Sequence, residues 1–246
     1  MINIKSEEEI KLIIKSANIL AQVKKIVYDY IKPGVSLLDL DTLANETTKK
    51  LGGSPAFLGY QGFTGTICAS VNEELIHGIP SKRILMEGDL VSIDMGVVYE
   101  GYYSDSAFTK AVGTPTQEDI FLIKAAEEAF HHGLAAIKPG VRTGDIAHAI
   151  GSYIRSQNLF TPLEFSGHGI GKSLHEEPYI YNDGAKGKGP ILENNMVICI
   201  EPMILQKSKK IKILKDGWTV IAASKKKSSH YEQTILIKDG KGIVLT

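Results

Sequence analysis

Five side chains that can bind metal ions lie between positions 94 and 232. Asp94 and Glu201 each end a short apolar run, and Glu232 precedes another. An ionised carboxylate beside an apolar strand is costly to bury unless it is paired or coordinates a metal. Asp105 and His168 complete the set, and glycines on both sides of His168 permit close backbone approach. Each residue alone is typical of a solvated strand end or a structural histidine, whereas the five together indicate a metal site.

Four carboxylates and one imidazole suit a hydrolase that uses two metal ions. Bridging carboxylates can hold two divalent ions about 3.5–4 Å apart, and a water between them becomes a nucleophile near neutral pH. Oxygen-rich ligation with one imidazole is compatible with cobalt, manganese, iron or zinc, so the residue types do not identify the metal. The expected cofactor is therefore a pair of divalent ions drawn from these four elements.

The spacing of apolar residues predicts the elements that must position these side chains. Capping signatures at Ser6 and Ser36 begin two helices, which end before Pro33 and at Gly52. The order helix, helix, strands then occurs a second time, which predicts an α+β fold. The remaining predicted elements are strands at 66–71, 90–98 and 102–110, helices at 117–137 and 143–157, strands at 196–201 and 231–237, and a hairpin that turns at Asp216-Gly217.

The two halves also share sequence, which supports an internal duplication. Ile31-Lys-Pro-Gly-Val35 recurs as Ile137-Lys-Pro-Gly-Val141, at an offset of 137 − 31 = 106. Segment 85–94 aligns with 192–201 at an offset of 192 − 85 = 107, and both end in candidate metal ligands. Lys-Pro-Gly alone often only ends a helix, but a second match at nearly the same offset favours duplication. We predict one catalytic domain, 1–246, with pseudo-twofold half-repeats of approximately 6–110 and 117–246.

Composition excludes several classes of protein. Lys plus Arg and Asp plus Glu both total 28 in 246 residues, so the overall charge does not call for nucleic acid or an acidic membrane. Only Cys68 and Cys199 are present, so neither a disulfide framework nor a thiolate zinc site is expected. No signal-peptide pattern and no run of about 18 apolar residues occurs. We therefore expect a cytoplasmic protein without a membrane segment.

The five candidate ligands match, in order and approximate spacing, the metal ligands of methionine aminopeptidases. The resemblance covers almost the whole chain. It is to the bacterial type I form, because the sequence has neither the long insertion of type II enzymes nor an N-terminal zinc-finger extension. It implies a pita-bread fold, in agreement with the internal repeat. The matching phrases are Cys68 through His77-Gly-Ile-Pro80, Gly167-His-Gly-Ile-Gly171 with His175-Glu-Glu-Pro178, Ile200-Glu-Pro-Met203, and Lys215-Asp-Gly-Trp-Thr-Val220.

This resemblance implies a metal-dependent aminopeptidase that hydrolyses the N-terminal methionine from nascent polypeptides and prefers a small second residue. It implies that Asp94 chelates one metal and that His168 and Glu201 hold the other. Asp105 and Glu232 would bridge the two ions. A metal-bridging hydroxide would attack the first peptide carbonyl, and the free amine of the substrate would coordinate a metal.

Three residues are implied to take part in catalysis. Glu201 would shuttle a proton besides ligating a metal. His175 would stabilise the tetrahedral oxyanion, and His77 would contact the scissile amide or the departing nitrogen. Both histidines would therefore also bind substrate. Outside its motif, His77 would be interpreted only as a turn residue before Gly78-Ile-Pro80.

Selectivity for methionine needs an apolar, polarizable pocket of limited depth. The resemblance assigns four residues to this pocket: Tyr60, Phe63, Cys68 and Trp218. Trp218 follows a predicted turn instead of lying in an apolar strand, which favours a pocket lid over core filling. Cys68 has no basic neighbour, so it is interpreted as a pocket or core residue and not as a nucleophile.

Two positions depart from the pattern of the family. Phe63 stands where many relatives carry tyrosine, and Gln233 follows Glu232 where many carry histidine. Neither is a direct ligand, so we expect activity to survive. The departures are expected to affect the pocket and the surroundings of the ligands.

Other functions fit the sequence less well. His175-Glu-Glu-Pro-Tyr179 lacks the second histidine of a His-Glu-x-x-His zinc helix, and no phosphate-binding Gly-x-x-x-x-Gly-Lys loop is present. A proline dipeptidase shares the expected fold, but such relatives generally carry a further N-terminal domain for which this chain has no room. A metal-free peptide-binding member of the fold typically loses ligands that this chain retains. Bound metal and turnover would distinguish enzyme from binding module.

Lysines cluster at 207–210 and 225–227, on both sides of the predicted hairpin. A solvated charged loop is the simpler interpretation. The functional interpretation is a transient contact with ribosomal RNA, which would suit an enzyme that acts on nascent polypeptide N-termini. Family precedent implies a monomer.

Overall fold

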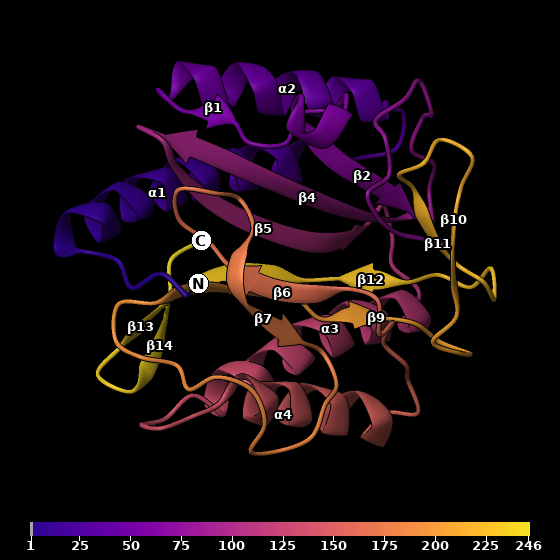
Figure 1. The fold of residues 1–246 in the computed structure, drawn as a ribbon. Coiled ribbons are helices and arrows are strands. Elements are labelled where there is room, and N and C mark those ends of the chain that lie inside the picture. The colour runs from indigo at the N-terminus through magenta and orange to yellow at the C-terminus, as the bar shows by residue number, and fades with distance from the viewer. Residues whose placement is uncertain (1) are drawn as a thin grey trace.

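The computed structural model describes residues 2–246, and Met1 lies outside the described part. Within it, a large curled sheet runs through the centre, one pair of helices lies on each side, and the two chain ends lie close together (Figure 1). The mixed α+β fold predicted from the sequence is confirmed. The helices are α1 (Glu7–Tyr30), α2 (Leu37–Lys50), α3 (Gln117–Ala135) and α4 (Thr143–Ser156), with a short 3-10 turn at Tyr60–Gly62.

Side-chain caps begin the first two helices where the sequence predicts them. Ser6 Oγ accepts a hydrogen bond from Glu9 N at 3.2 Å, and Ser6 N donates to Glu9 Oε2 at 2.8 Å. Asp39 and Ser36 form the same reciprocal pair at the start of α2. These bonds satisfy backbone groups that have no partner inside the helix, so both predicted starts are confirmed.

The central sheet has nine strands, and its main path runs β1-β4-β5-β13-β8-β6-β7, with β2 paired to β4 and β14 to β13. Two small sheets, β10-β11-β3 and β12-β9, flank one end of it. The first-half strands are β1 (Ser54–Pro55), β2 (Ile67–Val71), β3 (Glu74–Ile76), β4 (Leu90–Tyr99) and β5 (Tyr102–Ala111). The others are β6 (Ser166–Gly169), β7 (Glu176–Tyr181), β8 (Val197–Ile200), β9 (Met203–Ile204), β10 (Ile211–Ile213), β11 (Val220–Ala222), β12 (Ser229–His230), β13 (Glu232–Lys238) and β14 (Lys241–Val244).

Equivalent contacts recur in the two halves and support the pseudo-twofold duplication. After α1, Leu85 N donates to Val35 O at 2.8 Å. At the corresponding place after α3, Leu192 N donates to Val141 O at 2.9 Å. The offsets of these pairs, 192 − 85 = 107 and 141 − 35 = 106, are those found in the sequence. In both halves, the linker between the two helices is thus hydrogen-bonded to the segment that precedes a central strand, β4 in the first half and β8 in the second.

The two largest apolar cores lie mainly in separate halves, two smaller ones contain residues of both halves, and the halves join in the middle of the sheet. One core packs α1 and α2 against β2 and β4, and the other packs α3 and α4 against β8 and β13. The seam between them is the pairing of β5 with β13, where Glu232 faces Ala107 and Gln233 faces Ser106. Side chains at this seam can therefore come from both halves.

Predicted and observed elements agree closely at most of the predicted boundaries. Strands β6 and β7 lie after the last predicted helix, where further strands are expected from the sequence without defined bounds. Asp94 lies in the middle of β4 and not at its end, whereas Glu201 follows β8 by one residue. None of the helices described is long and apolar enough to cross a membrane.

Candidate metal centre

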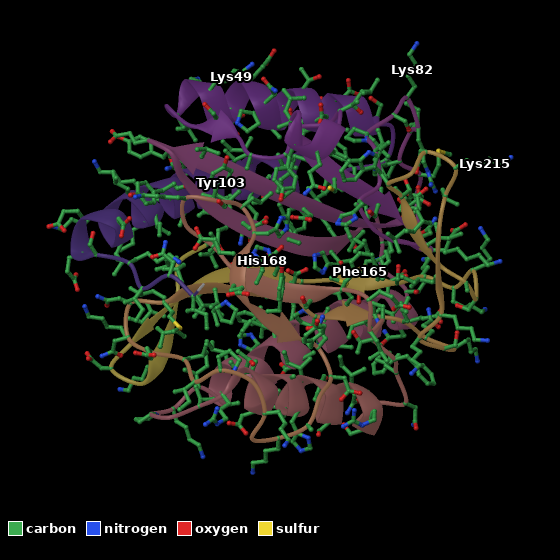
Figure 2. The ribbon with its side chains drawn as sticks, in the orientation of Figure 1. Lys49, Lys82, Tyr103, Phe165, His168 and Lys215 are labelled. Carbon is green, nitrogen blue, oxygen red and sulfur yellow. The ribbon has the colours of Figure 1, made fainter. Side chains whose placement is uncertain are left out.

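The five candidate metal ligands come from neighbouring elements of the central sheet. Asp94 lies on β4, Asp105 on β5, His168 on β6 and Glu232 on β13, while Glu201 follows β8. These elements are consecutive in the sheet order β4-β5-β13-β8-β6. His168 lies at the centre of the molecule, between the two helix pairs (Figure 2). The sheet therefore brings candidate ligands from both halves of the chain to one place.

His168 faces three of the carboxylates at distances that suit a shared ion. Its Nε2 lies 3.5 Å from Glu201 Oε1, 3.9 Å from Glu232 Oε1 and 4.0 Å from Asp105 Oδ2. These separations exceed ordinary hydrogen-bond lengths. Two atoms that bind one ion at about 2.0–2.2 Å can lie up to roughly 4.4 Å apart, so every separation fits co-ligands of a metal.

The backbone determines which nitrogen of His168 faces these carboxylates with a lone pair. Nδ1 lies 2.9 Å from the carbonyl oxygen of Gly169. Because a carbonyl oxygen only accepts, Nδ1 carries the hydrogen. Burial lowers the pKa of His168 to about 3, which keeps the ring neutral. Nε2 therefore offers a lone pair, as a metal ligand must.

Two carboxylate oxygens at the centre are buried without a partner. Asp94 Oδ1 and Glu232 Oε1 make no hydrogen bond within the described residues. Buried polar atoms in folded proteins are nearly always satisfied, so orphaned oxygens need an explanation. A divalent cation between the carboxylates would satisfy both.

The electrostatics of the carboxylates also favour a bound cation. Burial raises the pKa of Asp94 to about 7. Burial and the neighbouring carboxylates raise the pKa values of Asp105, Glu201 and Glu232 well above their usual range. Four ionised carboxylates are therefore unfavourable here without compensating positive charge. The donor set and its electrostatics fit divalent metal ions.

Two further histidines lie beside this cluster. The ring of His175 is 4.3 Å from that of His168, and its Nδ1 is 2.8 Å from the hydroxyl of Tyr60. Desolvation by surrounding protein atoms lowers the pKa of His175, although the residue as a whole is exposed. His77 has a backbone φ of 58°, which is uncommon for a residue with a side chain. Burial lowers its pKa to about 4, so both rings are neutral at pH 7.

Every residue that the sequence analysis assigned to the site lines one cavity of about 290 Å³. The four proposed pocket residues form its apolar side, and the rings of Phe63 and Trp218 meet edge to face at 5.1 Å. Cys68 lies opposite Asp94 in the β2–β4 ladder, and burial raises the pKa of its thiol. Apolar lining residues absent from the sequence assignment are Phe57, Ile76, Phe165, Leu174 and Met203. The ring of Phe165 meets that of His77 edge to face at 5.6 Å.

Sequence reasoning missed two titratable residues at the centre. His230 is buried, and its Nε2 lies 3.9 Å from Glu232 Oε2. Cys199 is within reach of His168 and Glu232, but burial raises the pKa of its thiol and its Sγ contacts Thr234. The signal for His230 was available, because residues two apart in an extended chain face the same side. His230 stands two positions before Glu232.

Gln233 faces away from the cavity into a polar network. Its Oε1 accepts hydrogen bonds from Lys24 Nζ at 3.1 Å and from Thr246 Oγ1 at 2.8 Å. Lys24 also donates to Ser106 Oγ at 2.9 Å, and burial lowers its pKa to about 8. The expected effect of Gln233 on the surroundings of the ligands thus has a structural basis.

A larger hollow of about 500 Å³ lies apart from this centre, between α4, β7 and the 183–190 loop. No histidine or cysteine of the described residues lines it. It therefore lacks an imidazole donor of the kind found at the metal centre, although it is the more voluminous of the two.

Comparison with known proteins identifies relatives over the full length. A model of metallopeptidase family M24 matches residues 11–239. Methionine aminopeptidase 1 of Bacillus subtilis is 42% identical over 246 residues, which cover 100% of this chain and 99% of the relative. Methionine aminopeptidase of Mycoplasma capricolum is 45% identical, with 98% of this chain and 96% of the relative covered.

Solved structures give the same picture of the fold. Methionine aminopeptidase of Thermotoga maritima has a TM-score of 0.98 and 38% identity, with 100% of this chain and 99% of the other covered. Prolidase of Pyrococcus furiosus has a TM-score of 0.79 and 26% identity. The match covers 99% of this chain but only 65% of the prolidase. The predicted pita-bread fold is therefore confirmed, and a third of the prolidase has no counterpart here.

Proposed function

The chain belongs to metallopeptidase family M24, it removes N-terminal methionine by metal-dependent hydrolysis, and we propose that five side chains hold two divalent ions for that reaction. The observation that carries the proposal is the convergence of these donors from neighbouring elements of the sheet. They meet around a neutral imidazole whose lone pair faces three carboxylates. The metal-dependent activity places this chain among the hydrolases.

Charge supports two ions in preference to one. Asp94, Asp105, Glu201 and Glu232 together carry four negative charges when ionised, which two divalent cations balance. Asp105 and Glu232, on the strands that join the halves, are the proposed bridges, while Asp94 serves one ion and His168 with Glu201 serves the other. When bound, cobalt, manganese, iron or zinc would acidify a water and polarise the scissile carbonyl.

The chain's own residues would then orient the substrate and move protons. Tyr60 holds the His175 ring through Nδ1, and we assign to the other nitrogen the stabilisation of the oxyanion that develops on the scissile carbonyl. His77 would contact the scissile amide or the departing nitrogen. Glu201 would carry a proton from the attacking water to the leaving amine.

The apolar side of the cavity supports recognition of methionine. Tyr60, Phe63, Cys68 and Trp218 line it, and aromatic rings make favourable contacts with a thioether sulfur. The cavity volume of about 290 Å³ leaves limited room beside a methionine side chain, which supports the preference for a small second residue. The proposed substrates are therefore nascent polypeptide N-termini that begin with methionine and a small residue.

Release of methionine from Met-Ala-Ser tests this function. Protein stripped of metal and supplied with manganese, cobalt, iron or zinc should release free methionine, and Asp105→Ala should release none. Asp183→Ala, which removes a half-buried carboxylate paired with Arg155 away from the metal centre, is the control and should retain activity. Met-Ile-Ser should be cleaved much more slowly than Met-Ala-Ser. No release by folded wild type with any of the metals would contradict the proposal.

We also propose a transient ribosome contact through exposed lysines beside the β10–β11 hairpin. Lys227 is not part of that surface, because it donates to Asp119 Oδ1 at 2.7 Å and to Gly88 O at 2.8 Å. Lys207, Lys209, Lys210 and Lys226 are exposed. Reversing these four charges should reduce co-sedimentation with ribosomes at low salt, and unchanged co-sedimentation would contradict the contact. The monomeric state and the cytoplasmic location remain predictions.

A further inference from the structure

His230 is a second buried imidazole at the centre, and the five-residue ligand set leaves it unused. It ends β12 and is 1% exposed. Its Nε2 lies 3.9 Å from Glu232 Oε2. One ligand atom each from Asp94, His230 and Glu232 lie within 4.8 Å of one another. This group shares Glu232 with the one around His168 and adds a second imidazole.

The backbone orients His230 in the same way as His168. The Nδ1 of His230 lies 3.3 Å from the carbonyl oxygen of Pro202, and a carbonyl oxygen only accepts. Nδ1 therefore carries the hydrogen, and Nε2 directs a lone pair at the carboxylates. A lone pair that faces a carboxylate oxygen at 3.9 Å makes no hydrogen bond. A cation between the two atoms would turn this repulsive arrangement into a favourable one.

The two oxygens of Glu232 face different histidines. Oε1 lies 3.9 Å from His168 Nε2, and Oε2 lies 3.9 Å from His230 Nε2. Both separations fit pairs of atoms that share one ion, since co-ligands at 2.0–2.2 Å lie at most about 4.4 Å apart. Glu232 is thus arranged to join two ions, each with an imidazole on its outer side.

We propose that His230 Nε2 is a sixth protein ligand, which binds one ion together with Asp94 and Glu232 on the side away from His168. The inference rests on the proposed two-ion function and deepens it. A nitrogen donor on each ion favours borderline metals such as cobalt and zinc over manganese, because imidazole suits the former better than an all-oxygen site does.

Two substitutions separate ligation from a structural role. His230→Asn retains an amide near the position of Nδ1, where it can still donate to Pro202 O, and it removes Nε2. His230→Gln carries its amide further out, to the level of Nε2. His148→Asn on α4 is the control, because it removes an exposed imidazole whose contact is Ser152.

Zinc binding measures the role of His230 independently of activity. Metal-free wild type and variants are loaded with two equivalents of zinc, and X-ray absorption counts the imidazoles per ion. Wild type and His148→Asn should average one imidazole per ion, and His230→Asn about one half. Calorimetric titration should show the affinity for one ion reduced at least about tenfold in His230→Asn, a loss that is typical of a disturbed ligand shell.

Each result decides the question. A wild-type average of one half, or unchanged zinc affinity and imidazole count in His230→Asn, would overturn the proposal. If His230→Asn fails to fold, the wild-type count and His230→Gln still decide it. A wild type that has one imidazole per ion but releases no methionine would refute the proposed function and leave this inference intact. The reverse result, methionine release with one half imidazole per ion, would refute only the inference.

Discussion

At the residue scale, a lysine lies behind the carboxylates proposed as metal bridges. Asp105 and Glu232 face the cavity, and the residues that follow them, Ser106 and Gln233, face the opposite side because side chains alternate along a strand. Lys24 from α1 donates to both of these residues. A partly buried ammonium therefore lies close to the negative charge of the centre, and desolvation opposes its protonation.

Lys24→Met should make the pH dependence of this burial visible. The pKa of Lys24 is about 8 in the folded chain, below its ordinary value of 10.5. Between these values the unfolded chain binds more protons, so wild-type stability rises with pH there. Ser106 and Gln233 keep other partners in the variant.

Urea denaturation of metal-free protein measures the difference in unfolding free energy between Lys24→Met and wild type. This difference should shift in favour of wild type as the pH is raised from 7 to 9.5. Lys25→Met, which removes an exposed lysine paired with Asp29, is the matched control and should show little change. A difference that is constant with pH for Lys24→Met would contradict the assignment of a lowered pKa.

At the scale of elements, the β10–β11 hairpin presents Trp218 to the cavity. Asp216 organises the turn, because its carboxylate accepts from Trp218 N and Thr219 N at 2.9 Å and from Thr219 Oγ1 at 2.6 Å. Gly217 has a φ of 78°, a conformation that glycine adopts without steric cost. The turn predicted at Asp216-Gly217 thus positions Trp218, which forms an aromatic wall of the pocket.

Asp216→Ala should make Trp218 more mobile and leave the metal centre unchanged. The loss of three hydrogen bonds should destabilise the folded turn by about 1–3 kcal/mol. We expect KM for Met-Ala-Ser to rise several-fold, with a smaller change in kcat, since the proposed catalytic residues lie on other elements. Steady-state kinetics measures both constants. Ser208→Ala in the preceding loop is the control, and an equal fall in kcat with unchanged KM would contradict the role of the turn.

At the scale of the whole molecule, the metal centre joins two half-repeats, each of which contributes most of one of the two largest apolar cores. Asp94 and Asp105 belong to the first half, and His168, Glu201 and Glu232 belong to the second. The β5–β13 pairing that connects the halves is short. Metal ions bound by both halves should therefore stabilise the seam as well as the site.

Metal removal should lower the melting temperature. An ion at 100 times its dissociation constant adds about 2.7 kcal/mol of stability. For a chain of this size, that corresponds to a loss of roughly 5–10 °C when the ion is removed. Calorimetry with and without a chelator measures the shift, and re-adding zinc should restore it. Asp105→Ala should show a much smaller shift, and an equal one would place the stabilising metal elsewhere.

Much of the fold and of the candidate site was predictable because it depends on residues that are close in sequence. The helix starts at Ser6 and Ser36 follow from caps that act over three positions. Strand β4 follows from a segment rich in apolar residues, and the half-repeat follows from two matched segments. The carboxylates were found because charge beside an apolar strand demands compensation. The assignments to metal and substrate also depended on the resemblance to a family.

Only the tertiary structure decided which distant residues meet. The pairing of β5 with β13 brings Lys24 to Gln233 across 209 positions, and the fold brings Lys227 to Asp119 across 108. Glu232 faces His168 for the same reason. Such contacts are set by strand register and by how the two halves pack, and a shift of one residue in register would turn every side chain of a strand to the opposite face. Local sequence patterns contain no measure of that register, so these contacts become visible only in the folded chain.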